Sequence, residues 1–352
     1  MTSDDDDDDG DGASDDDVPH GDDVAAGGAP LERPVPADWL ALREPADARA
    51  RDEAAEALLG PLAEALTGSL AAAPAERAGP EGAGRDGGAE AGRAPGAGGP
   101  HVLDVGAGTG AGARWLASRL RARLGRGARW TLLDHDADLL ARAGAAPGAT
   151  GHGARRVLGD LHRAADLLRG TGAPGEGATD GAGRPDLVTA TALLDLLRPV
   201  EVEVLAGAVV DAGVPLLVAL TVTGEVQLDP PDPLDAELAA AFDAHQRRGG
   251  RLGPDAVAPV VERLRSAGLE VLTASSPWRL GTASPSGGGG DADLLAAWAR
   301  GRAEAAVEHD GALAAPAARW SRAREEQARA GALGAVVGHV DLLALPGAAR
   351  GG

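Results

Sequence analysis

The stretch that decides the fold is His101-Val-Leu-Asp-Val-Gly-Ala-Gly-Thr-Gly110. Its first half is a short apolar segment typical of a buried strand, and glycines follow at positions 106, 108 and 110. Such glycines let the chain turn sharply off a strand and let ligand atoms approach bare backbone. A helix that follows the loop points its free N–H groups and positive dipole end at the ligand. The stretch therefore predicts a strand, a glycine loop and a helix that together bind an anionic group.

Strand and helix signals alternate from this stretch to Leu345. Strands are expected at 102–105, 130–133, 156–159, 186–190, 215–222, 269–274 and 335–345, and helices at 113–124, 137–143, 200–212, 254–267, 291–307 and 315–330. Repeated strand–helix units predict an α/β fold with a doubly wound, mostly parallel sheet of seven strands. Such a sheet binds its ligand at the carboxyl ends of the strands.

The chain before the glycine stretch divides by composition. Residues 1–30 are mostly Asp, Gly and Ala and predict a disordered acidic tail. Residues 31–70 are rich in Ala, Glu and Leu and predict N-terminal helices that form a cap, broken or kinked at Pro61. Residues 71–100 are rich in Ala, Gly and Pro and predict a linker. The remaining segment, 101–346, is expected to be the ligand-binding domain.

Composition narrows the partners and the location. The formal net charge is −21, and twelve of the 54 acidic residues lie in residues 1–23. An acidic body repels phosphate backbones, which disfavours a nucleic-acid partner. No apolar run is long enough to cross a bilayer, and the acidic start is the opposite of a signal peptide, so a cytoplasmic protein is expected. Without Cys there is no disulfide or thiolate chemistry. The absence of Lys, Ile and Asn, whose codons are AT-rich, indicates a GC-rich, bacterial type of genome.

Three acidic residues narrow the meaning of the glycine loop. Glycine spacing alone also fits the dinucleotide-binding fingerprint. Asp104, however, lies just before the loop, where a cationic amino group would need a counter-charge. Asp134 ends the second expected strand, where a carboxylate can accept from two ribose hydroxyls, and Asp160 follows the third, where it can accept from an adenine amino group. Each of these acids taken alone could instead cap a helix or lie in a solvated loop.

The same residues resemble the motifs of a known family. Residues 102–110 resemble the first motif of class I S-adenosylmethionine-dependent methyltransferases, 132–136 the second, 159–161 the third and 185–194 the fourth. The likeness keeps the family's motif order from about residue 101 to 345 and includes a last strand that in the family runs antiparallel. It implies the cofactor S-adenosyl-L-methionine and a Rossmann-like fold.

The resemblance also implies roles for single residues. Asp104, Gly106, Gly108 and Gly110 would hold the methionine part of the cofactor. Asp134 would bind ribose, and Asp160 with the backbone of Leu161 would face adenine. The gap between Gly110 and Asp134 is longer than usual in the family, which leaves Asp136 as an alternative ribose ligand.

Candidates for handling the acceptor lie outside these motifs. His245 follows the fifth expected strand and is a candidate general base, with Arg247 or Arg248 as a ligand for a substrate carboxylate. The alternative is an amphipathic helix with Phe242 in the core. The neighbouring Asp229-Pro-Pro-Asp232 is interpreted as a loop.

Two further substrate candidates come from other parts of the chain. Arg43 could bind a substrate carboxylate, although an ion pair with Glu44 or Asp47 competes with that role. Trp278 could line an acceptor pocket or pack in the core. His135 and His162 lack the spacing of metal ligands, so no metal is expected.

The sequence thus predicts a methyltransferase for a small-molecule acceptor, with oxygen, nitrogen or carbon as the methylated atom. A methyltransferase for tRNA or protein and a non-catalytic, cofactor-binding regulatory protein remain alternatives. No feature of the sequence indicates the oligomeric state.

Overall fold

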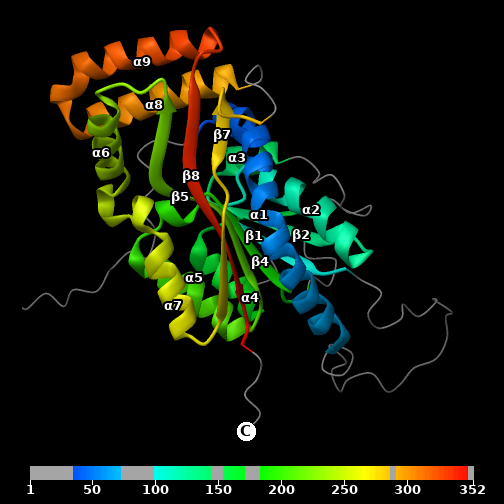
Figure 1. Ribbon diagram of the computed structural model, residues 1–352. Coiled ribbons are helices and arrows are strands. Elements are labelled where there is room, and N and C mark those ends of the chain that lie inside the picture. The colour runs from blue at the N-terminus through cyan, green and yellow to red at the C-terminus, as the bar shows by residue number, and fades with distance from the viewer. Residues whose placement is uncertain (1–34, 73–98, 144–153, 171–182, 286–290, 348–352) are drawn as a thin grey trace, which may run out of the picture. The chain divides into compact units, whose positions relative to one another are not determined.

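The computed structural model describes residues 35–72, 99–143, 154–170, 183–285 and 291–347 (Figure 1). The acidic tail expected at 1–30 and nearly all of the linker expected at 71–100 lie outside the described residues. The described residues all belong to the unit that runs from Arg33 onward.

One mixed sheet forms the centre of this unit. Its strands are β1 (His101–Val105), β2 (Arg129–Asp134), β3 (Arg155–Leu158), β4 (Leu187–Thr191), β5 (Leu216–Asp229), β6 (Glu270–Ser275), β7 (Trp278–Gly281) and β8 (Gly334–Leu345). The order is β3-β2-β1-β4-β5-β8-β6, and β7 pairs with β8 beside that path. Strands β3, β2, β1, β4 and β5 run parallel, and β8 is antiparallel to β5, β6 and β7. The doubly wound, mostly parallel α/β sheet predicted from the sequence is confirmed.

Helices cover both faces of the sheet. They are α1 (Ala37–Ala72), α2 (Ala111–Leu124), α3 (Ala137–Arg142), α4 (Leu161–Arg169), α5 (Pro199–Ala212), α6 (Asp235–Gln246), α7 (Val257–Ser266), α8 (Ala292–His309) and α9 (Ala314–Arg329). Leucines and alanines of α4, α5 and α7 form one apolar core with the sheet. Helices α1 and α2 form a second core on the other side, which includes Leu58, Leu62, Trp115 and Leu116. Burial on both sides explains why β1 is apolar along most of its length.

Helices α6, α8 and α9 and strand β7, called the cap below, lie beyond the carboxyl ends of the parallel strands. Strand β5 pairs with β4 only as far as Ala219 and then continues to Asp229 beside the first half of β8 (Figure 1). Helices α6, α8 and α9 and strand β7 pack on this extension and form a third core with Trp278, Trp298 and Trp320. The first turns of α1 join the same core through Ala46 and Ala50. The cap therefore lies at the edge where a sheet of this kind binds its ligand.

Three expectations about elements need correction. The N-terminal helices are a single helix of 36 residues, which continues through Pro45 and Pro61 instead of breaking at Pro61. Its apolar contacts with α2 and the sheet outweigh the backbone hydrogen bonds that the two prolines remove. In addition to the seven predicted strands, the sheet contains β7, which was not expected after Ser275-Ser-Pro277. Helix α4, between β3 and β4, was likewise not expected.

Candidate functional site

The glycine loop after β1 takes a backbone form that few other residues adopt. Gly106, Gly108 and Gly110 have φ values of 65°, 52° and 78°. A Cβ atom added to Gly106 would lie 3.0 Å from the Leu193 side chain, and one added to Gly108 would lie 3.3 Å from Leu40 of α1. A side chain would therefore be strained at all three positions, and at Gly106 and Gly108 it would also crowd a neighbouring leucine. The loop lies between the segment after β4 and the first turns of α1.

Asp104 is a buried carboxylate beside this loop. It is 1% exposed, and its Oδ1 accepts a hydrogen bond of 2.7 Å from the hydroxyl of Thr189. Its Oδ2 is buried and has no hydrogen-bond partner among the described residues. Burial raises the pKa of Asp104 to about 6, against the lowering effect of Thr189 and of the Arg51 charge. A buried acceptor without a donor is rare in native proteins and marks a place for a ligand or a water molecule.

Arg51 of α1 is a cation whose charge acts on Asp104. Its side chain is 1% exposed, its Nε donates to the carbonyl of Asp47, and its guanidinium lies 4.8 Å above the Trp115 ring. Neither Nη1 nor Nη2 has a hydrogen-bond partner in the part of the chain that the structure describes. Burial lowers the pKa of Arg51, while the charges of Asp47, Asp341 and Asp104 raise it. Unsatisfied donors and acceptors thus occur together beneath the first half of α1.

Asp134 connects the end of β2 to the glycine loop. Its Oδ2 accepts from the N–H of Gly108 at 2.7 Å, and its Oδ1 accepts from the N–H of Asp136 at 2.9 Å. The residue is 6% exposed. Each carboxylate oxygen can accept a second hydrogen bond, so these contacts leave capacity for ribose hydroxyls. A role in ribose binding remains a prediction.

The other two acids after strands cap helices. Asp136 is the N-cap of α3 and accepts from the N–H groups of Asp138 and Leu139. Asp160 is the N-cap of α4, where its Oδ1 accepts from the N–H groups of His162 and Arg163. Asp160 is exposed, and Leu161 begins the helix after it. Both acids therefore cap a helix, which was the alternative considered from the sequence. Both helix-capping hydrogen bonds of Asp160 go to Oδ1, so Oδ2 takes no part in them.

Two substrate candidates lie in contact although they are far apart in the sequence: Arg43 of α1 and Trp278 of β7. The Nε of Arg43 lies 3.0 Å from Oδ2 of Asp47, and the indole N–H of Trp278 donates to Oδ1 of the same carboxylate at 3.0 Å. The Arg43 guanidinium lies 4.9 Å from the centre of the Trp278 ring. Trp39 and His339 also contact this ring, with centroid distances of 6.5 and 5.2 Å. The structure contains both alternatives considered from the sequence: Arg43 forms an ion pair with Asp47, and the indole of Trp278 is buried.

His339 is a neutral member of this group. Burial lowers its pKa to about 3, helped by the Arg43 charge. Its Nδ1 lies 3.0 Å from the carbonyl oxygen of Val337. The group of Arg43, Asp47, Trp39, Trp278 and His339 therefore presents aromatic surface and an internally neutralised ion pair at the base of the cap.

His245 contacts residues of the cap, and Arg247 contacts the segment before α7. The Nε2 of His245 lies 3.0 Å from Oε2 of Glu308 on α8 and also contacts Arg248. Arg247 donates from Nε to Asp255 at 2.7 Å. Both residues thus connect α6 to its neighbours, and their contacts with described residues do not include the glycine loop. Their catalytic and substrate-binding roles remain predictions.

Asp195 is a further candidate site residue, which was not predicted from the sequence. It lies in the short 3-10 helix Leu194–Leu196 after β4 and is 8% exposed. Its Oδ1 is buried and has no hydrogen-bond partner among the described residues. Burial raises the pKa of Asp195 to about 6, and a hydrogen bond from its own backbone N–H, together with the charges of Arg43 and Arg251, opposes that rise. The available signal was its position one residue beyond the fourth motif.

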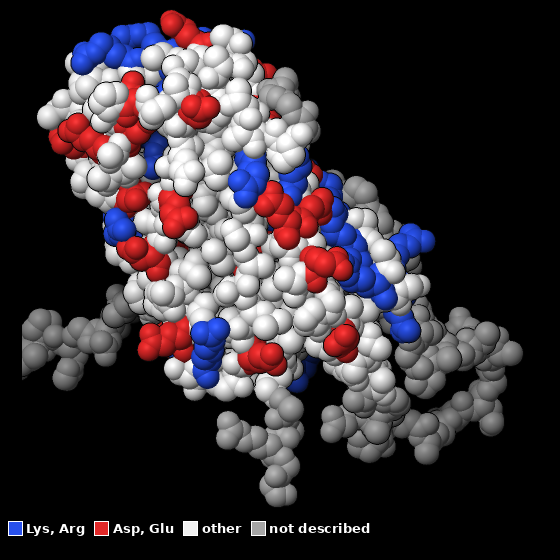
Figure 2. Space-filling view, viewed as in Figure 1, with Lys and Arg blue, Asp and Glu red and all other residues white. Residues whose placement is uncertain are grey.

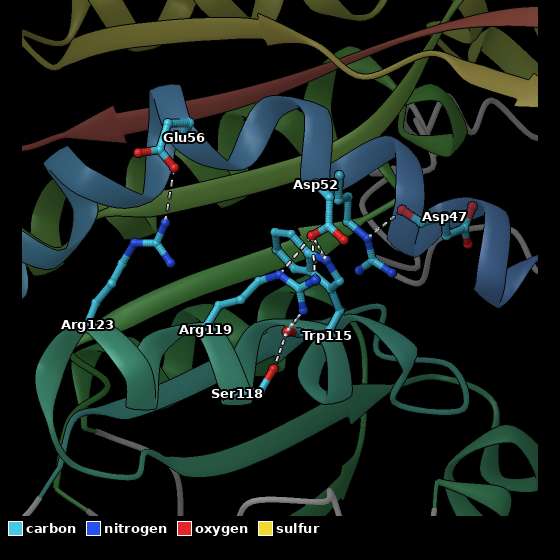
Figure 3. Close-up of polar contacts among 8 residues, drawn as sticks. Asp47, Asp52, Glu56, Trp115, Ser118, Arg119 and Arg123 are labelled. Carbon is cyan, nitrogen blue, oxygen red and sulfur yellow. Dashed lines mark hydrogen bonds and ion pairs between the residues drawn. The ribbon is translucent and has the colours of Figure 1, made fainter. Parts of the chain in front are cut away.

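Polar contacts hold α1 over α2 (Figure 3). Asp52 accepts from the indole N–H of Trp115 at 3.1 Å and from Nε of Arg119 at 2.8 Å. Arg119 also stacks on the Trp115 ring at 4.6 Å, and one turn further on Arg123 pairs with Glu56 at 3.7 Å. These contacts fix the helix that carries Arg43, Asp47 and Arg51 over the carboxyl edge of the sheet.

Comparison with known proteins finds matches among solved structures, at low identity and low TM-score. No protein-family model and no curated protein sequence matches the chain. Solved structures that resemble it include a cyclopropane synthase from Mycobacterium tuberculosis, with 14% identity, 70% of this chain and 78% of that chain covered, and a TM-score of 0.36. An arsenic(III) S-adenosylmethionine methyltransferase from Chlamydomonas reinhardtii has 15% identity, coverages of 72% and 64%, and a TM-score of 0.33. An O-methyltransferase family protein from Burkholderia thailandensis has 22% identity, coverages of 50% and 47%, and a TM-score of 0.33.

The strand order, with one antiparallel strand between β5 and β6, and the glycine loop after β1 define the fold as a doubly wound, Rossmann-like α/β sheet. Within the described ranges, no helix has both the length and the apolar character needed to cross a membrane. The same residues contain no group of three or more His, Cys, Asp or Glu side chains that could hold a metal ion.

Proposed function

We propose that this protein is an S-adenosylmethionine-dependent methyltransferase that acts on a small-molecule acceptor. The observation that carries the proposal is the pair formed by the left-handed glycine loop and the unpartnered Oδ2 of Asp104. The start of α2 offers N–H groups to a carboxylate, and Asp104 offers an acceptor to an ammonium group. A ligand that ends in an amino acid, as this cofactor does, satisfies both.

The remaining residues fit the rest of the cofactor. Asp134 can accept from ribose hydroxyls with the lone pairs that Gly108 and Asp136 leave free. The first turn of α4 presents the backbone of Leu161, next to the outer oxygen of Asp160, to an adenine ring. When bound, the cofactor supplies an electrophilic methyl group on a sulfonium. The protein then has to position an acceptor, exclude water and accept a proton.

The surroundings favour a small acceptor. Trp39 and Trp278 with α1 cover the carboxyl edge, and the cap of α6, α8 and α9 stands beyond it. On the face shown in Figure 2, acidic and basic side chains are interspersed, and basic ones gather mainly over α9 and along one side. The chain as a whole is strongly acidic, which disfavours a long nucleic acid as the acceptor.

Thermal unfolding with S-adenosylmethionine, S-adenosylhomocysteine and NAD tests the proposal. A ligand that binds only the folded state at a hundredfold excess over Kd stabilises it by about 2.7 kcal/mol. The two adenosyl compounds are expected to raise the melting temperature, while NAD leaves it unchanged. A shift with NAD alone would refute the assignment.

The matched control is Gly106→Ala. An added Cβ atom would lie 3.0 Å from Leu193 on a residue with φ of 65°, so the loop must deform. The variant is expected to lose the shift with both adenosyl compounds. An unchanged shift would place the ligand away from this loop. Methyl transfer from labelled cofactor to candidate acceptors then separates an enzyme from a cofactor-binding protein without turnover.

A further inference from the structure

Asp195 lies at the carboxyl edge beside the glycine loop. Leu193, two residues earlier, would be the nearest neighbour of a Cβ atom on Gly106. The segment from β4 to Asp195 therefore passes directly against the loop. Its start, Ala192, has φ of 51° and donates from its N–H to the carbonyl of Ala219 on β5. A non-glycine residue in this region is strained, and the surrounding structure holds it there.

The carboxylate of Asp195 has an oxygen that no described residue satisfies. The side chain is more than nine-tenths buried, and Oδ1 has no donor within the described ranges. An ionised carboxylate in such a place is costly without a hydrogen-bond donor. Retaining it is understandable if a donor arrives with a ligand.

The cations near Asp195 come from two other elements. Arg43 belongs to α1 and Arg251 to the segment after α6, and both act on Asp195 through their charges. Arg43 is itself neutralised by Asp47. Neither arginine donates a hydrogen bond to Oδ1. These cations favour the ionised carboxylate and leave its oxygen free to accept a proton.

We propose that Asp195 accepts the proton of the methyl acceptor, and that the acceptor is therefore an amine or hydroxyl whose nucleophilic atom carries a hydrogen. This inference rests on the proposed function. As the acceptor nitrogen or oxygen forms its bond to the methyl carbon, the carbon–sulfur bond breaks and its electron pair stays on sulfur. The proton of the acceptor passes to Oδ1 of Asp195.

Binding of two cofactor analogues tests the proposal without a known acceptor. Sinefungin carries a protonated amine where the transferable methyl and sulfonium of the cofactor stand, and S-adenosylhomocysteine has a neutral sulfur there. If Asp195 faces the transferable methyl, its carboxylate accepts a charge-assisted hydrogen bond from that amine. Isothermal titration of the wild-type protein is expected to give sinefungin at least about tenfold tighter binding than S-adenosylhomocysteine.

Substitution then assigns this preference to a residue. Asp195→Asn is expected to bind S-adenosylhomocysteine within about twofold of wild type and to lose the preference for sinefungin. Asp243→Asn is the matched control, because Asp243 also has an Oδ1 without a partner among the described residues but lies on α6 beside Gly224. That variant is expected to keep the preference. Equal binding of the two analogues by wild type, or an undiminished preference in Asp195→Asn, would overturn the proposal. Failure of both analogues to bind wild type would instead refute the proposed function.

Discussion

Replacing Asp104 by Asn should stabilise the unliganded protein and weaken its ligand binding. Folding raises the pKa of this carboxyl from an ordinary value of 3.8 to about 6. The folded state therefore holds the proton more tightly than the unfolded state, and the free energy of unfolding falls as pH rises from about 4 to 6. Above pH 6 the full cost is present. A rise of roughly two pKa units corresponds to about 3 kcal/mol.

The amide removes this cost while keeping the local contact. Asn can still accept from the hydroxyl of Thr189 through Oδ1, as Asp104 does. Its NH2 group replaces the unpartnered Oδ2, and this buried donor makes 3 kcal/mol the upper limit of the gain. Asp104→Asn is therefore expected to raise the melting temperature at pH 7 by several degrees. At pH 4, where the carboxyl is already protonated in the folded state, the difference should vanish.

The same substitution should act in the opposite direction on binding. An amide NH2 cannot accept from the ammonium group of S-adenosylhomocysteine, and the buried counter-charge is lost. Isothermal titration at pH 7 is expected to show at least about tenfold weaker binding, which matches the loss of one charge-assisted hydrogen bond.

Asp341→Asn separates the two effects. Burial also raises the pKa of Asp341 to about 6, and its Oδ1 accepts from the N–H of Leu220 and the hydroxyl of Ser276. This variant is expected to be stabilised at pH 7 with unchanged affinity for S-adenosylhomocysteine. A lower melting temperature for Asp104→Asn at pH 7, or wild-type affinity, would refute the reasoning about Asp104.

Four further substitutions test other contacts. Asp134→Ala should weaken S-adenosylhomocysteine binding about tenfold, because it leaves the N–H of Gly108 without its acceptor. Asp136→Ala should lower the free energy of unfolding by about 1 kcal/mol, because Asp136 is an N-cap, and should keep wild-type affinity. Isothermal titration and urea unfolding of both variants distinguish these outcomes. Asp52→Ala should lower the free energy of unfolding by about 1 kcal/mol, because the contacts between α1 and α2 are partly exposed, and an unchanged urea midpoint would contradict this. His245→Ala should keep cofactor affinity within about twofold; a turnover loss of about 10²–10⁴ with an identified acceptor would establish the residue as a base, and unchanged turnover would exclude that role.

Most of the sheet could be predicted because its signal is local. The strands from β1 to β6 and β8 begin within about two residues of the expected positions, since apolar runs bounded by glycine or polar residues mark buried strands. Strand β5 was expected to end at Val222, but it continues to Asp229. Beyond Val222 the residues alternate between partly buried and exposed, and their pairing depends on β8, more than a hundred residues later. The continuity of α1 depends in the same way on distant partners.

The site divides along the same line. The glycine loop and the caps at Asp136 and Asp160 involve residues close in sequence, and the sequence identified these candidates. Asp195 could not be recognised because its burial depends on tertiary packing, and the charges that act on it belong to Arg43 and Arg251, which are distant in the sequence. The pairing of Arg43, Asp47 and Trp278 likewise joins two segments more than two hundred residues apart.

If the proposed function is correct, the buried acids would bind the cofactor and its demethylated product with different affinities. Asp104 and Asp195 each have a pKa raised to about 6 by burial, so the unliganded edge carries two carboxylates whose ionisation opposes folding at pH 7. A ligand with an additional positive charge offsets part of this cost, and a ligand without it does not. The sulfonium of S-adenosylmethionine has that charge and the sulfur of S-adenosylhomocysteine lacks it, although both share the methionine end. If Asp195 faces the sulfonium, loss of its charge during the reaction weakens the attraction and favours release of the product.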